Sequence, residues 1–304
     1  MAAGWLQARR DYLLEVQNAD GGWGYVRGGR SWLEPTALAM LALEGERAAG
    51  PALERAWRLV RSWQRRDGAW QAAAEVDGAH WTTALAVLLH SVRGVRDGGF
   101  DRGVEWLVGT KGAEGTWVKR LLYRSRPDLY SYDPAILGWP WLPGTGSWVE
   151  PTAHALMALR AAAPRVAERG GRQWRRLEAR VKLAERMLVE RSAVDGGWNY
   201  GNRIVLGETL PSYPETTGVA LLAMRDSPDF DPERALQTAL GHWRGTTSPL
   251  ARAWLGICLR NYGIAPPENG SLAAGPPGYN HVAALEALAA EEGNYRLFCA
   301  GSPR

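Results

Sequence analysis

The chain has 304 residues, enough for one large domain or two small ones with a sizeable core. Hydrophobic residues make up 46% and charged residues 22%, as in ordinary soluble globular proteins, and no apolar run is long enough to span a membrane. The net charge of +4 comes without a basic stripe interleaved with aromatics, so we do not expect nucleic-acid binding. With only Cys258 and Cys299, no Cys-x-x-Cys pair and no secretory leader, we expect a cytoplasmic protein.

Tryptophan is unusually abundant, with 16 Trp against 3 Phe. A buried indole N–H needs a hydrogen-bond partner, so such an excess indicates a repeated structural need. Four blocks share one spacing, in which an apolar pair is followed by a polar residue and a Gly-x-Trp turn. The blocks are Tyr12, Leu13, Gln17, Gly21, Trp23; Leu59, Val60, Gln64, Gly68, Trp70; Trp106, Leu107, Lys111, Gly115, Trp117; and Met187, Leu188, Ser192, Gly196, Trp198. We expect the Gly to end a helix, the Trp to cover that end, and the polar residue to bond its free carbonyls.

Each block is followed by a Thr that opens an apolar helix rich in small residues, at 36–43, 83–89, 152–159 and 217–224, with degenerate copies at 249–259 and 281–288. The Trp-to-Thr distance is 13 residues in the first two copies, 35 in the third and 19 in the fourth, which indicates inserted loops. The apolar helices should be inner helices, and Arg- and Glu-rich ones such as 172–190 outer helices. The pattern predicts an all-α fold, a single-domain α/α toroid of about six helical hairpins across residues 1–304.

The block from Tyr12 to Trp23 resembles the QW motif of squalene-hopene and oxidosqualene cyclases. The Thr-Ala helices are similar to those of the same cyclases and of protein prenyltransferase β subunits. The resemblance covers about residues 5 to 290 and implies a divergent single-domain member of this terpene cyclase-like superfamily. It implies an isoprenoid-handling enzyme that binds an apolar or prenyl diphosphate-like substrate in a central cavity. Peripheral contact with the inner membrane and a partner protein or domain are left open.

The cyclases of this superfamily take their proton from an Asp-x-Asp-Asp motif just before a Thr-Ala helix, and no repeat here has that motif. The corresponding positions, two residues before each Thr, hold Glu34, Trp81, Glu150 and Glu215. Pro35 and Pro151 suit the first position of a helix, which would make the preceding glutamates capping residues. A capping carboxylate is stabilised in its ionised form, so we expect Glu34 and Glu150 to hold helix ends. Substrate contact by Glu34, Trp81 and Glu215 is the functional alternative.

Glu150 and His154 lie one turn apart on the same face of an inner helix, where they are candidates for a catalytic acid–base pair. The alternative is a half-buried histidine satisfied by the protein. No metal or cofactor is expected, because Cys258 lacks the Asp of the prenyltransferase Asp-x-Cys zinc site.

The insertion at about 118–148 is rich in Pro and Gly and should lie at the same end as the three glutamates. Its candidate substrate contacts are Tyr132, Asp133, Trp139 and Trp148, with Arg120, Arg124 and Arg126 as candidates to hold a diphosphate. A packed flap with solvated arginines is the alternative.

Two other functions remain open at this point. The missing cyclase and zinc motifs allow a noncatalytic ligand- or protein-binding toroid. Tryptophan platforms and paired carboxylates also suit sugars, so a carbohydrate-active α/α barrel is the other. A deep apolar cavity would favour an isoprenoid, and a shallow polar site a sugar.

Overall fold

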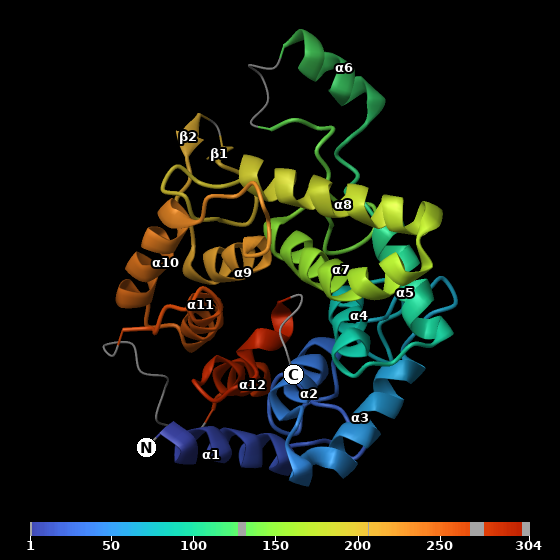
Figure 1. The fold of residues 1–304 in the computed structure, drawn as a ribbon, viewed down its shortest axis with the longest axis vertical. Helices are drawn as coiled ribbons and strands as arrows, with labels where there is room; N and C mark the ends of the chain where they lie inside the picture. Colours follow the sequence, from blue (N-terminus) through green and yellow to red (C-terminus); the bar gives the residue numbers. More distant parts are fainter. Residues whose placement is uncertain (1, 127–131, 206, 268–276, 300–304) are drawn as a thin grey trace.

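Six helices form a closed inner ring in the computed structural model, which describes residues 2–126, 132–205, 207–267 and 277–299. They are α2 (Leu33–Leu43), α4 (Thr83–Val92), α7 (Val149–Arg169), α9 (Pro214–Met224), α11 (Pro249–Asn261) and α12 (Asn280–Ala289). Each packs against the next, and α12 packs against α2 to close the ring (Figure 1). The all-α toroid predicted from the sequence is confirmed.

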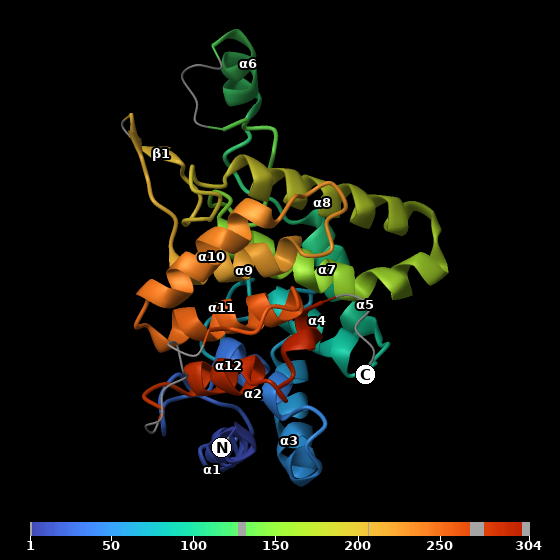
Figure 2. The ribbon, with the colours of Figure 1, turned by 60° about the vertical axis from the view of Figure 1, so that its left-hand side comes forward.

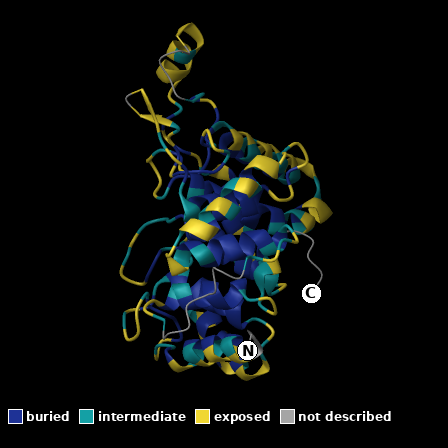
Figure 3. Cartoon of the chain, turned by 90° about the vertical axis from the view of Figure 1, so that its left-hand side faces the viewer, coloured by how far each residue is buried: buried dark blue, intermediate teal, exposed yellow. Residues whose placement is uncertain are grey.

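An outer layer of helices surrounds this ring. Its described members are α1 (Ala2–Glu15), α3 (Gly50–Ser62), α5 (Gly98–Gly109), α8 (Gly171–Glu190) and α10 (Glu233–Gly245). The remaining elements are α6 (Trp117–Ser125), a hairpin of β1 (Ile204–Val205) and β2 (Glu208–Thr209), and the 3₁₀ turns η1 (Arg47–Ala49) and η4 (Tyr295–Phe298). Buried residues concentrate on the inner helices and exposed ones on the outer layer (Figure 3), as expected from their composition. Across the described residues, no helix is long and apolar enough to cross a membrane.

The repeated tryptophans link the outer helices α1, α3 and α8 to the inner helices that follow them. The backbone N–H of Trp23 donates to Thr36 Oγ1 at 2.9 Å, and its indole N–H donates to the Leu13 carbonyl at 2.7 Å. Trp70 and Trp198 repeat both bonds with Thr83 and Val60 and with Thr217 and Leu188. These three indoles are fully buried. The prediction that the block tryptophans cover helix ends is confirmed for them.

In the third repeat the structural tryptophan is Trp139, and the assignment of Trp117 to this position was wrong. Trp139 donates its backbone N–H to Thr152 Oγ1 at 2.9 Å and its indole N–H to the Leu107 carbonyl at 3.0 Å. Trp117 lies on α6 and is 76% exposed. The Trp-to-Thr spacing therefore stays at 13 residues. Trp139 bonds to both Leu107 and Thr152, so the extra residues of this repeat lie between Leu107 and Trp139. The insertion therefore comes earlier in the chain than the predicted range of 118–148.

The block glutamines also differ from the prediction, since they bond to the next outer helix. Gln17 Nε2 donates to the Gly21 carbonyl at 2.8 Å and to the Ala52 carbonyl in α3 at 2.9 Å. Gln64 makes the matching bonds, to the Gly68 carbonyl and to the Gly99 carbonyl in α5. Gly21 has a φ of 95°, and a Cβ there would lie 2.8 Å from the Arg55 backbone. The turn therefore needs glycine both for its backbone angle and for this close approach.

Residues from the two ends of the chain close the ring. The Asn280 side chain donates to the Gly24 carbonyl at 2.9 Å and accepts from the Tyr12 hydroxyl at 2.8 Å. Arg9 of α1 and Glu286 of α12 form a buried ion pair, with Nε and Oε2 2.9 Å apart. Helix α1 thereby serves as the outer partner of the last inner helix.

Arginines cap the carboxyl ends of several inner helices. Arg165 donates to the His90 carbonyl at 3.2 Å, Arg225 to the Asn261 carbonyl at 2.8 Å, and Arg260 to the Ala289 carbonyl at 2.8 Å. A planar guanidinium can satisfy two or three carbonyls at once, which a lysine does less well. This capping is one structural use for the strong preference of the sequence for arginine.

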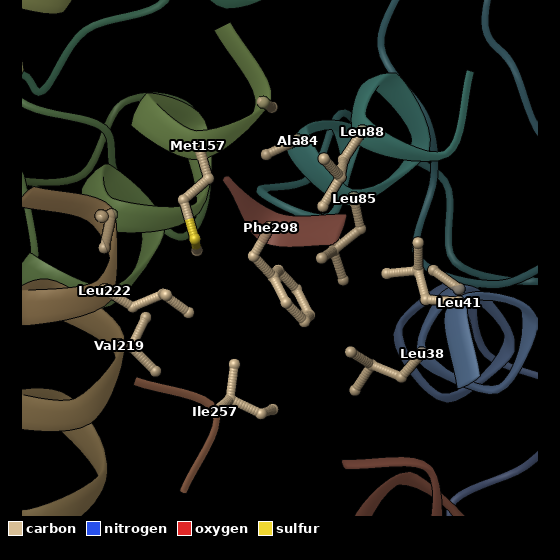
Figure 4. Close-up of a cluster of buried hydrophobic side chains, with 14 of the residues drawn as sticks. Leu38, Leu41, Ala84, Leu85, Leu88, Met157, Val219, Leu222, Ile257 and Phe298 are labelled. Atoms are coloured by element: carbon tan, nitrogen blue, oxygen red, sulfur yellow. The ribbon is translucent and has the colours of Figure 1, made fainter. Parts of the chain in front are cut away.

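The interior is filled at the carboxyl end of the inner ring. Phe298 of η4 lies among apolar side chains from five of the ring helices (Figure 4). These neighbours are Leu38, Leu41, Ala84, Leu85, Leu88, Met157, Val219, Leu222 and Ile257. None of these side chains is more than 2% exposed, so no ligand fits between them.

Candidate active site

Three glutamates gather at the amino end of the inner ring. Glu34, Glu150 and Glu215 lie in the first turns of α2, α7 and α9, and the charges of Glu34 and Glu215 both act on Glu150. Each side chain is half-buried. We call these three residues the carboxylate cluster.

The prediction that Glu34 and Glu150 are capping residues was wrong. The helices begin one residue earlier, at Leu33 and Val149, and the capping positions belong to Trp32 and Trp148. No side chain makes a capping hydrogen bond at either helix start. The two carboxyl groups are therefore not held in their ionised form by backbone N–H groups.

Burial dominates the acidity of Glu34 and Glu150. It raises the pKa of Glu150 to about 8, with the negative charges of Glu34 and Glu215 adding to the effect. Burial also raises the pKa of Glu34, although the Tyr25 hydroxyl partly offsets this by donating to Glu34 Oε2 at 2.5 Å. Within the described chain none of the three glutamates has an arginine, lysine or histidine as an ion-pair partner. Glu150 therefore keeps its proton at neutral pH and is able to donate it.

His154 lies one turn after Glu150 on α7 and is 3% exposed. Burial lowers the pKa of His154 to about 3, so the imidazole is neutral at neutral pH. Its ring centroid is 5.0 Å from that of Trp81 and 5.5 Å from that of Trp254. No hydrogen bond joins His154 to any residue the structure describes. It therefore differs from the half-buried, protein-satisfied histidine considered above, and its nitrogens can serve a ligand.

Several aromatic rings lie toward the amino end of the ring, where the carboxylate cluster is found. Trp81, His154 and Trp254 are nearly buried and form what we call the floor. Trp81 also meets Trp141 edge to face, with centroids 5.1 Å apart. Nearer the surface, Tyr200 lies 5.2 Å from Tyr213 by ring centroids and is exposed. The amino end of the ring therefore combines carboxyl groups with flat apolar surfaces.

Two of the predicted substrate contacts line a separate cavity of about 270 Å³ next to the start of α7. Tyr132 and exposed Trp148 form part of its wall, together with Glu114 and Arg191. Arg191 and Glu114 are a buried ion pair, 3.2 Å between Nη2 and Oε1, and the Arg191 guanidinium lies 3.9 Å from the Tyr132 ring centroid. Nothing in the sequence pattern pointed to Glu114 or Arg191.

Trp139 and Asp133 have structural positions. The Trp139 indole is buried beneath the Arg180 guanidinium, which lies 3.8 Å from its ring centroid. The Asp133 carboxylate accepts the Ala135 N–H at 2.8 Å and so holds a turn, while its own N–H donates to Glu190. No described contact joins either residue to the carboxylate cluster.

The sequence reasoning missed Tyr25 and the floor residue Trp254. A signal for Tyr25 was present, because it comes two residues after the structural tryptophan of its repeat. Trp141 and Tyr200 occupy the same position after Trp139 and Trp198. An aromatic residue at this position is thus a feature of three repeats, and all three lie near the amino end of the ring. The described residues contain no group of three or more His, Cys, Asp or Glu side chains that could hold a metal ion.

No protein-family model matches the sequence, and no curated protein matches it either. Solved structures do resemble it. The type II terpene cyclase MstE from Scytonema superposes with a TM-score of 0.55 at 19% identity, covering 95% of this chain and 77% of that one. A variant of MstE with geranylgeranyl dihydroxybenzoate bound gives the same score and identity. A glycosidase variant reaches a TM-score of 0.62 at 11% identity, covering 97% and 96%, and another, in complex with glucose, reaches 0.59. These likenesses define the class of fold, a terpene-cyclase-like α/α toroid shared with α/α-barrel glycosidases.

Proposed function

We propose that this chain is an enzyme in which Glu150 acts as a general acid at the amino end of the ring. One observation carries the proposal, namely that burial and two neighbouring carboxylates raise the pKa of Glu150 to about 8. A catalytic acid is most effective when its pKa lies near the working pH. Neighbouring carboxyl groups whose pKa values are driven apart by their surroundings often serve as the acid and the base of one reaction.

The acidity of Glu150 indicates what kind of atom it protonates. A carboxyl group with a pKa near 8 suits an oxygen that becomes a leaving alcohol, because the proton then moves as the carbon–oxygen bond breaks. Protonating an alkene carbon requires a much stronger acid, and the Asp-x-Asp-Asp partner that would support one is missing. We therefore place the reaction at a carbon–oxygen bond.

Cleavage of a glycosidic bond fits these surroundings best. Glu150 would protonate the leaving oxygen, while Glu215 or Glu34 would act as nucleophile or base and water would complete the hydrolysis. The exposed rings of Trp148 and Tyr200 offer platforms for sugar faces. The packed interior around Phe298 leaves no deep tunnel for a folded hydrocarbon. The likeness to glycosidases over nearly the whole of both chains is in keeping with this function.

An isoprenoid substrate is the second candidate, favoured by the floor. Trp81, His154 and Trp254 present a largely apolar surface next to the Glu150 helix, on which a short prenyl group with a leaving oxygen would fit. The MstE variant described above binds a geranylgeranyl compound in the same fold. In both candidates neutral His154 would position the substrate by hydrogen bonding, and it would do so without carrying charge.

The test compares wild type with Glu150→Gln on aryl glycosides of graded leaving-group acidity and, in parallel, on prenyl aryl ethers and prenyl diphosphates. Loss of a general acid should slow poor leaving groups far more than good ones, by a factor of about 10² to 10⁴ for the poorest. Wild-type activity should fall as the pH rises through about 8, where Glu150 loses its proton. Glu233→Gln, an exposed first-turn glutamate of α10, is the matched control and should leave rates unchanged.

Equal slowing of all leaving groups by Glu150→Gln would contradict the acid role. Activity on prenyl compounds alone would select the second candidate. If neither class reacts, the noncatalytic binding toroid becomes the better description.

A further inference from the structure

Helix α6 stands away from the body of the protein. It projects from one end of the molecule in both ribbon views (Figures 1 and 2). None of its nine residues is buried. A helix of this length is marginal in water without packing, so its amphipathic sequence indicates a missing surface.

The side chains of α6 divide into two faces. With about 100° of turn per residue, Trp117, Val118, Leu121 and Leu122 fall within an arc of about 140°. All four are exposed, Trp117 at 76% and Leu121 at 55%. Cationic side chains occupy the opposite side and the flank, at Lys119, Arg120, Arg124 and Arg126. Residues 116–126 contain no Asp or Glu.

We infer that α6 binds the surface of an anionic lipid bilayer, with Trp117, Leu121 and their apolar neighbours entering the headgroup boundary. An apolar face with tryptophan and leucine, opposite a face with cationic and no acidic side chains, is what helices lying in the membrane interface have. The positive charge of α6 complements acidic headgroups, and no Asp or Glu in residues 116–126 would repel them. This surface is separate from the carboxylate cluster, so the inference goes beyond the proposed function and does not depend on it.

The β1–β2 hairpin offers a second point of contact. Ile204 and Val205 of β1 are exposed, and Figures 1 and 2 show the hairpin at the same end of the molecule as α6. Reversible membrane binding generally needs two weak attachments, such as an apolar insertion and a basic patch. The two exposed elements together meet that requirement.

Co-sedimentation of the full chain with vesicles tests the inference. We expect binding to vesicles that contain phosphatidylglycerol, weaker binding to phosphatidylcholine alone, and loss of binding as salt is raised. Arg120→Ala should weaken binding about fivefold, because each basic residue near an anionic membrane surface contributes about 1 kcal/mol to the binding free energy. Leu121→Glu should abolish it. Val194→Glu, at an equally exposed apolar position far from α6 in sequence, is the matched control and should bind as wild type does.

Three results would overturn the inference. The first is the absence of binding to anionic vesicles at low salt, and the second is binding that Leu121→Glu leaves intact. The third is a change in molar mass by light scattering when Leu121→Glu is introduced, which would show that α6 packs on a second copy of the chain instead. Thermal unfolding of each variant checks that the ring is intact.

Discussion

Replacing Glu150 by glutamine should change how the stability of this protein depends on pH. Glutamine has nearly the shape of the protonated carboxyl group but cannot ionise. In the folded chain the pKa of Glu150 is raised from 4.5 to about 8. Between these values the folded state holds a proton that the unfolded state has lost, so the free energy of unfolding falls as the pH rises. Below pH 4.5 both states are protonated and this contribution is fully present.

The size of the effect follows from the pKa shift. A shift of 3.5 units, at about 1.4 kcal/mol per unit, amounts to about 5 kcal/mol lost between pH 4.5 and pH 8. Domains are typically stable by only about 5–15 kcal/mol, so the loss is large. Relative to wild type, Glu150→Gln should therefore gain up to about 5 kcal/mol between pH 4 and pH 9.

Urea unfolding at pH 4, 6, 8 and 9, followed by circular dichroism, measures this difference directly. Glu233→Gln provides the control, because its carboxylate is exposed on the first turn of α10. A free-energy difference between Glu150→Gln and wild type that is the same at every pH would refute the reasoning, since Glu150 would then titrate alike in both states.

Three further predictions concern the ring itself. Trp23→Phe leaves the Leu13 carbonyl without its indole donor and should cost about 1–3 kcal/mol in urea unfolding, whereas Trp117→Phe should cost less than about 0.5 kcal/mol. Arg9→Met should cost about 3–5 kcal/mol because it removes the cation of the buried Arg9–Glu286 ion pair, and the double variant Arg9→Met/Glu286→Met should recover most of that loss. Phe298→Ala should cost about 3–5 kcal/mol and open space for a small apolar ligand, so benzene should raise the Tm of this variant and not of wild type.

The toroid could be predicted because the contacts that form it depend on short sequence blocks that repeat along the chain. Each structural tryptophan must bond both a helix-end carbonyl and a later threonine, which fixes the spacing of three blocks. The same requirement for two hydrogen bonds explains why the prediction for the third block was wrong. Trp117 has the block spacing but lies before the inserted residues, and only Trp139 can reach both Leu107 and Thr152.

The candidate site was predicted in its residues but not in its chemistry. Glu34, Glu150 and Glu215 were found because they precede repeated threonines. The acidity of Glu34 and Glu150 was misjudged, since the sequence did not show that their helices begin one residue earlier and leave the two carboxyl groups without backbone donors. Burial then decides the pKa of Glu150, together with the charges of Glu34 and Glu215, which the fold brings in from two other helices. The closure of the interior by Phe298 likewise depends on where the last turn of the chain packs.

The proposed role of Glu150 as a general acid depends most on its protonation in the folded protein. Infrared difference spectra of wild type and Glu150→Gln across pH 4 to 10 observe the carboxylic acid carbonyl directly. We predict one glutamic acid carbonyl that persists at neutral pH, disappears with a midpoint near 8, and is missing from Glu150→Gln. Loss of every protonated glutamate signal below about pH 5, near the ordinary glutamate pKa, would contradict the account.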